Sequence, residues 1–232
     1  ALALAIPATM MGAPAYPGVL TRANPDGTTV EFRLNGDEFF SFMTEVNRNT
    51  ILERNAEGKN EIVAYTAKDN KREVIISADN LVNPATGKQV PVRSFTFSAD
   101  NSKVLIYTNT RRVWRYDTRG DYWVLDLTNG NLRQIGKDKP ESTLMFAKFS
   151  PDGKKVAYVS LNNIYVEDVE TGKTTTLTSD GCDYIVNGTF DWVYEEEFYC
   201  RDGFRWSPDS KFIAYWQSDT KGTGTFYMIN NI

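Results

Sequence analysis

The 232-residue sequence contains no histidine. This absence excludes Ser-His-Asp and Cys-His catalysis, and any histidine-ligated metal site, from these residues. The Gly-x-Ser-x-Gly turn that presents a serine nucleophile on an α/β-hydrolase sheet is also absent. We therefore expect no complete catalytic triad, metal or cofactor within this chain.

Cysteine is almost absent as well. Cys182 and Cys200 are the two in the sequence, too few for a disulfide framework. One bridge between them would suit an oxidising compartment, and the sequence leaves open whether it forms.

The sequence has no excess of basic residues and no long apolar run. Its formal net charge is −4 and its isoelectric point is near 5.1, so nucleic acid is a poor partner. No segment after the first residues approaches the roughly 20 apolar residues of a transmembrane span. With 41% hydrophobic and 13% aromatic residues, the chain can instead bury a sizeable core.

The first 15 residues are apolar and uncharged, and they read ALALAIPATMMGAPA. The final Ala-Pro-Ala suits signal-peptidase cleavage after Ala15. We interpret residues 1–15 as the remnant of a signal peptide, whose initiator Met and basic region are not in the sequence, and expect export to the periplasm or the extracellular space. A disordered Ala/Pro leader is the alternative.

A hairpin motif repeats along the rest of the chain. Three copies read FTFSADNSKVLIYT, AKFSPDGKKVAYVS and FRWSPDSKFIAYWQ, at residues 95–108, 147–160 and 204–217. Each has an aromatic strand, a Ser-x-Asp turn and an alternating apolar strand. Pro, Asp, Gly and Asn supply the backbone conformations that such turns need.

Two of these hairpins are followed by a second one, at residues 122–135 and 164–177. Two hairpins make a four-stranded unit, and the turn serines Ser98, Ser150 and Ser207 recur every 52 and 57 residues, close to one propeller blade with insertions. Residues 62–77 look like a second hairpin alone, a degenerate first blade. We therefore predict an all-β fold, a partial β-propeller of about four blades of four-stranded antiparallel sheet, over residues 61–232. A β-sandwich built from the same hairpins is the alternative.

Residues 16–60 differ in sequence pattern from the repeated hairpins. Strand, turn and strand character runs from Asp26 to Phe40, and this stretch resembles the opening segment of immune-inhibitor-A-like metallopeptidases. It carries no His-Glu-x-x-His zinc motif. We treat residues 16–60 as a separate N-terminal β-hairpin segment; a metallopeptidase pro-segment would be followed by that zinc motif.

Three successive glutamates lie among aromatic residues in the run DWVYEEEF, Asp191 to Phe198. From the residues alone, this run fits a solvated helix start, with Asp191 as N-cap and the glutamates near the positive end of the helix dipole. Arg115, in VWR, would by itself be a surface strand arginine.

The same residues resemble a known family. The run NGTFDWVYEEEF, followed by RDGFRWSPDSKFIAYWQ, is similar to the propeller of dipeptidyl peptidase IV, a prolyl oligopeptidase-type serine peptidase. The likeness extends from about residue 95 to the end of the sequence. It implies an eight-bladed propeller together with an α/β-hydrolase domain that these residues do not contain, and often a homodimer.

The resemblance also implies roles for individual residues. Glu196 and Glu197 would hold the free α-ammonium of a peptide substrate, and Arg115 would bind a substrate backbone carbonyl. Adjacent carboxylates repel each other, so a bound ammonium relieves that repulsion while making charge-assisted hydrogen bonds. Structural support would come from four neighbours: Asp191, Trp192, Tyr194 and Glu195.

We therefore expect the substrate-recognition part of an exported serine exopeptidase that releases N-terminal dipeptides, Xaa-Pro or Xaa-Ala, and that is inactive as this segment alone. The alternative from another class is a non-catalytic periplasmic propeller that serves as a binding scaffold. A Gly-x-Ser-x-Gly turn with Asp and His in the downstream sequence would distinguish the peptidase from the scaffold.

Overall fold

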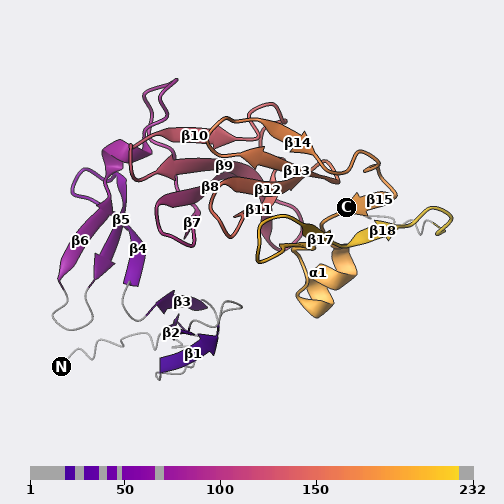
Figure 1. Ribbon diagram of the computed structural model, residues 1–232, viewed down its shortest axis with the longest axis horizontal. Coiled ribbons are helices and arrows are strands. Elements are labelled where there is room, and N and C mark those ends of the chain that lie inside the picture. The colour runs from indigo at the N-terminus through magenta and orange to yellow at the C-terminus, as the bar shows by residue number, and fades with distance from the viewer. Residues whose placement is uncertain (1–18, 24–28, 37–40, 46–48, 66–70, 225–232) are drawn as a thin grey trace, which may run out of the picture. The chain divides into compact units, whose positions relative to one another are not determined.

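The structure is a computed structural model that describes residues 19–23, 29–36, 41–45, 49–65 and 71–224. The chain forms two compact units, Ala1–Ser77 and Ala78–Ile232 (Figure 1). The predicted signal-peptide remnant, residues 1–15, lies outside the described residues.

The first unit contains two three-stranded antiparallel sheets. One has the order β1-β2-β3 and comprises Val19–Ala23, Thr29–Gly36 and Ser41–Glu45. The other has the order β4-β5-β6 and comprises Asn49–Arg54, Asn60–Tyr65 and Arg72–Ile76. The strand character expected between Asp26 and Phe40 is present as β2, with residues 26–28 and 37–40 outside the described part.

The hairpin predicted over residues 62–77 is confirmed as β5 and β6. Strand β4 pairs along the whole of β5, with Leu52 opposite Ile62. The boundary predicted between residues 60 and 61 therefore runs through a sheet, and the compact units divide instead between Ser77 and Ala78.

The second unit begins with a short 3-10 helix, Ala78–Leu81, and contains two four-stranded antiparallel sheets. The first sheet, here blade A, has the order β10-β9-β8-β7; its strands are Ser94–Phe97 (β7), Lys103–Arg112 (β8), Asp117–Asp126 (β9) and Leu132–Ile135 (β10). The second, blade B, has the order β11-β12-β13-β14; its strands are Met145–Phe149, Lys155–Ser160, Asn163–Asp168 and Thr174–Thr176.

Each blade consists of two consecutive hairpins, as the sequence predicts. In both, every strand pairs with the next one along the chain. A sheet of sequential neighbours is the blade of a propeller, whereas sandwich strands typically cross between two sheets. The prediction of a partial β-propeller is confirmed, and two of its blades are complete four-stranded sheets in the described residues.

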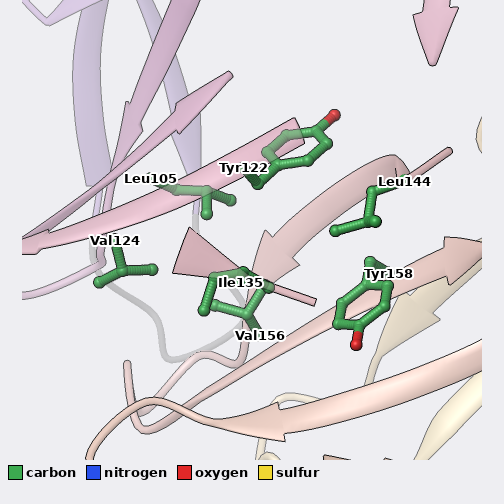
Figure 2. Packing of buried hydrophobic residues seen from close by; sticks show 7 residues of the cluster. All are labelled: Leu105, Tyr122, Val124, Ile135, Leu144, Val156 and Tyr158. Carbon is green, nitrogen blue, oxygen red and sulfur yellow. The ribbon is translucent and has the colours of Figure 1, made fainter. Parts of the chain in front are cut away.

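The core lies between the blades. Side chains of successive β12 residues point to opposite faces: Val156 and Tyr158 pack toward blade A, while Ala157 and Val159 belong to a second cluster with Phe204. All four β12 side chains are fully buried. Figure 2 shows the first cluster, which consists of Leu105, Tyr122, Val124, Ile135, Leu144, Val156 and Tyr158. Burial on both faces explains why β12 reads as a continuous apolar run.

The three Ser-x-Asp turns have one hydrogen-bonding pattern. In blade B, Ser150 Oγ donates to Asp152 Oδ1 at 2.6 Å and accepts from the Lys155 backbone N–H at 3.0 Å. The Ser98 and Ser207 turns repeat both bonds. The fourth residue of each turn has a positive φ, and these residues are Asn101, Gly153 and Ser210. The serine side chain thus fixes the register of each hairpin.

The third repeat forms a shorter hairpin. Strands β16 (Phe204–Trp206) and β17 (Ile213–Tyr215) pair with each other, and β15 (Ile185–Asn187) pairs with β18 (Gln217–Asp219). The helix α1, Trp192–Phe198, lies between β15 and β16 in the sequence. None of the helices in the described residues is long and apolar enough to cross a bilayer.

Candidate functional site

The acidic run forms the helix α1. Its first turn is capped by Asp191, whose backbone is extended and whose Oδ1 accepts a hydrogen bond from the Tyr194 N–H at 3.0 Å. A side-chain acceptor at this position satisfies one of the free N–H groups of a helix start. The helix ends at Phe198, and the C-cap residue Tyr199 has a left-handed φ of 55°. Asp191 therefore has the capping role predicted from the sequence.

Helix α1 buries two glutamates and exposes the third. Glu195 and Glu196 are 2% and 7% exposed, whereas Glu197 is exposed. Tyr194 stacks on Phe190 with 5.4 Å between ring centroids and also contacts Trp216 at 5.8 Å. Aromatic packing of this kind anchors the helix on the loop residue Phe190 and on Trp216, which lies between β17 and β18.

The long β8–β9 hairpin of blade A brings Arg115 to this helix. Its tip is residues 113–116, closed by a hydrogen bond from the Val113 N–H to the Tyr116 carbonyl at 3.1 Å. Arg115 Nε lies 2.6 Å from Glu196 Oε2, and the Arg115 backbone N–H points at Glu196 Oε1 over 3.4 Å. The Glu196 side chain is 1% exposed and that of Arg115 is 69% exposed.

The contact between Arg115 Nε and Glu196 Oε2 is an ion pair. Glu196 Oε2 is buried and has no hydrogen-bond donor among the described residues. The carboxylate thus has a charge partner and still has unused capacity to accept a hydrogen bond.

A second contact joins the same two segments. The Arg201 guanidinium lies over the Tyr116 ring, 3.4 Å from its centroid. Burial raises the pKa of the Glu195 carboxyl; the positive charge of Arg201 opposes that rise, and the negative charge of Glu196 adds to it. The Glu195 Oε1 and Arg201 Nε atoms are both buried without a hydrogen-bond partner in the described part of the chain.

The structure thus brings together two of the three residues assigned to binding. Arg115 and Glu196 are in contact although they are 81 positions apart, while Glu197 is on the exposed side of α1. Of the two aromatics predicted to support the site, Tyr194 contacts Phe190 and Trp216 and is 37% exposed, while Trp192 is 48% exposed.

Sequence reasoning missed Tyr116 and Arg201. Tyr116 directly follows the predicted Arg115, and Arg201 follows the acidic run closely, but no spacing rule connects them. The sequence left undecided whether Cys182 and Cys200 form a disulfide; both are free thiols in the structure.

Similarity to known proteins identifies the family. The family model described as "Dipeptidyl peptidase IV (DPP IV) N-terminal region" matches residues 98–232, which is more than half of the chain. The chain belongs to this family. The resemblance found in the sequence is therefore confirmed.

Individual dipeptidyl aminopeptidases are also similar to this chain in sequence. Dipeptidyl aminopeptidase B from Saccharomyces cerevisiae is 32% identical over 167 residues, covering 71% of this chain and 20% of the yeast protein. A probable dipeptidyl-aminopeptidase B from Talaromyces marneffei is 32% identical over 130 residues, covering 56% of this chain and 14% of its relative.

A solved structure of the family has the same fold. Dipeptidyl peptidase 4 from Porphyromonas gingivalis superposes with a TM-score of 0.63 at 26% identity, over 88% of this chain and 26% of that chain. The present chain thus spans about a fifth to a quarter of the length of these peptidases. Among the described residues, no group of three or more His, Cys, Asp and Glu side chains is placed to hold a metal ion.

Proposed function

We propose that this chain is the substrate-recognition propeller portion of an exported serine exopeptidase that releases N-terminal dipeptides, Xaa-Pro or Xaa-Ala, from peptides. The observation that supports this best is the contact between Arg115 and the buried carboxylate of Glu196. It places an acidic group for an ammonium beside a basic group for a carbonyl. The family relationship supplies the peptidase class.

The free peptide ammonium is bound by Glu196 and Glu197. Glu197 is exposed and meets the incoming cation first. Glu196 Oε2 then accepts a hydrogen bond from the ammonium, for which it has a free lone pair. Arg115 covers Glu196 in the absence of a peptide, so we expect its guanidinium to shift when the ammonium binds.

Arg115 then binds a substrate carbonyl. Its guanidinium carries five N–H donors, of which the Nε group faces Glu196. The remaining donors are on the exposed end of the side chain and can reach a backbone oxygen. Fixing both the ammonium and a carbonyl sets how far along the peptide the cleaved bond lies.

Hydrolysis itself needs groups outside these 232 residues. We assign the serine nucleophile, aspartate and histidine to an α/β-hydrolase domain, because the present chain has no histidine. The selective pocket for proline or alanine belongs to that domain, and the leader at residues 1–15 would direct export.

The test uses a chimera in which residues 98–232 replace the matching propeller segment of the P. gingivalis peptidase. We expect Glu196→Gln and Glu197→Gln each to lower kcat/KM for Ala-Pro-p-nitroanilide roughly ten- to hundredfold, the equivalent of a lost hydrogen bond to a charged group. Glu170→Gln, at an exposed glutamate, is the matched control. Unchanged hydrolysis by both variants would refute the assignment.

A further inference from the structure

Two buried polar atoms beside the Arg115–Glu196 contact belong to charged side chains but make no hydrogen bond. They are Glu195 Oε1 and Arg201 Nε, both buried and both without a donor or acceptor among the described residues. Glu195 is 2% exposed. Buried groups of this kind are costly unless an opposite charge compensates them.

Arg201 supplies that charge. It is the positive group that acts on Glu195, against the neighbouring negative charge of Glu196. Without Arg201, two adjacent buried carboxylates would have Arg115 as their cation, and Arg115 is 69% exposed. Arg201 therefore makes it possible for α1 to bury both glutamates.

Arg201 also reaches the hairpin that carries Arg115. Its guanidinium lies face-on over Tyr116 at 3.4 Å from the ring centroid, and Tyr116 is half-buried. Consecutive tip residues thus make complementary contacts: Arg115 contacts a glutamate on α1, and Tyr116 contacts an arginine that follows α1. The hairpin has few other attachments at its end, because Trp114 and Arg115 are both exposed.

We infer that Arg201 is a positioning residue that holds the tip of the β8–β9 hairpin against α1, by stacking on Tyr116 and by compensating the charge of Glu195. It keeps Arg115 over Glu196 without being expected to touch the substrate. The positioning of the tip stands on the contacts above. Its importance for peptide binding rests on the proposed function.

The experiment measures hydrogen–deuterium exchange of the amides of residues 112–117 in the 232-residue chain without peptide. In Arg201→Ala and Tyr116→Leu we expect exchange of these amides to be about fivefold faster, the effect of losing a partly buried cation–π contact. Tyr116→Phe keeps the ring and should exchange as the unchanged chain does. Arg201→Lys keeps the charge but not the planar face, so its exchange should be intermediate.

Arg205→Ala is the matched control, because Arg205 is a nearby exposed arginine that pairs with Asp202 at 3.0 Å. Exchange in β12 shows whether each variant is folded. If Arg201→Ala is folded and its tip exchanges at the unchanged rate, the inference is overturned. If that variant does not fold, the contrast between Tyr116→Leu and Tyr116→Phe decides: equal rates in the two overturn it.

A second measurement separates this inference from the proposed function. Calorimetric titration with Ala-Pro-amide, and with its N-acetylated form as the uncharged comparison, gives the affinity for a free amino terminus. We expect Arg201→Ala to weaken binding of Ala-Pro-amide by about the same factor as it speeds amide exchange at residues 112–117. Faster exchange with unchanged affinity would support the positioning of the tip and overturn its importance for peptide binding, whereas equal affinity of the unchanged chain for Ala-Pro-amide and its N-acetylated form would contradict the proposed function itself.

Discussion

Glu195 carries a carboxyl group that is almost removed from solvent, on a helix that it shares with a second buried glutamate. Its raised pKa means that the carboxyl holds a proton more tightly in the folded protein than in the unfolded chain. Below the ordinary pKa of 4.5 the carboxyl is protonated whether the protein is folded or unfolded, and it then costs no stability. As the pH rises through the folded-state pKa, ionisation of a buried group lowers stability.

We therefore expect Glu195→Gln to unfold at a higher urea concentration than the unchanged chain at pH 7, and at a similar one at pH 4.5. The amide cannot ionise, so it avoids the burial cost that is the largest cause of the shift. Urea unfolding curves at the two pH values measure this. Equal midpoints at pH 7 would mean that Arg201 fully offsets the burial; exposed Glu170→Gln is the control.

Asp100 has a lowered pKa, in contrast to the raised pKa of Glu195. The Ser98 hydroxyl, followed by the Ser102 backbone N–H, donates to its carboxylate and lowers its pKa to about 2. Its contribution to stability is present above the ordinary value of 3.8 and is lost as the pH falls through about 2. We expect Asp100→Asn to flatten the acid end of the stability profile slightly, as seen by thermal unfolding between pH 2 and 5. The effect is small because Asp100 is exposed.

At the scale of elements, the Ser-x-Asp turn is the unit that the chain repeats. In blade B the Ser150 side chain is buried and makes bonds to both ends of the turn. Its removal leaves the Lys155 N–H without that acceptor. We expect Ser150→Ala to lower the free energy of unfolding by about 1–3 kcal/mol, measured by urea unfolding. Ser207→Ala, in the less buried third turn, should cost less, and a larger loss at Ser207 would contradict this reasoning.

Helix α1 has only seven residues and depends on its cap. Such a short helix is marginally stable by itself. Losing the Asp191 side chain should therefore destabilise the first turn by about 1 kcal/mol, so that it frays. We expect faster amide exchange at Tyr194 in Asp191→Ala and nearly normal exchange in Asp191→Asn, because asparagine also caps. Equal exchange in both variants would argue that packing of Tyr194 holds the helix without the cap.

At the scale of the whole molecule, stability of the second unit depends on packing between blades. Leu144 is 1% exposed and lies in the cluster that joins blades A and B (Figure 2). Glu167 of blade B also accepts hydrogen bonds from Arg133 and the Gly136 N–H. We expect Leu144→Ala to lower the unfolding free energy by about 2–5 kcal/mol, and Leu177→Ala, at a site 47% exposed, by much less.

The repeated hairpins could be predicted because their information is local. Each Ser-x-Asp turn is closed by hydrogen bonds between residues at most five positions apart, such as Ser150 and Lys155. A short stretch of sequence therefore contains the whole pattern. The strand pairs within each blade follow for the same reason. Strands β4 and β5 also join through a local turn, in which Asn55 Oδ1 accepts from the Glu57 and Lys59 N–H groups and Gly58 has a positive φ. This turn lacks the Ser-x-Asp pattern, so the boundary drawn between residues 60 and 61 separated two paired strands.

The sequence by itself determined the all-β class, the recurrence of blades and the family, since these follow from short-range turn chemistry and a contiguous acidic motif. Only the tertiary structure decided which glutamates of that motif are buried, and that Arg115 and Tyr116 meet α1 and Arg201. These contacts join residues 81 and 85 positions apart. Their geometry depends on how one blade is stacked on the next, which no local pattern of residues encodes.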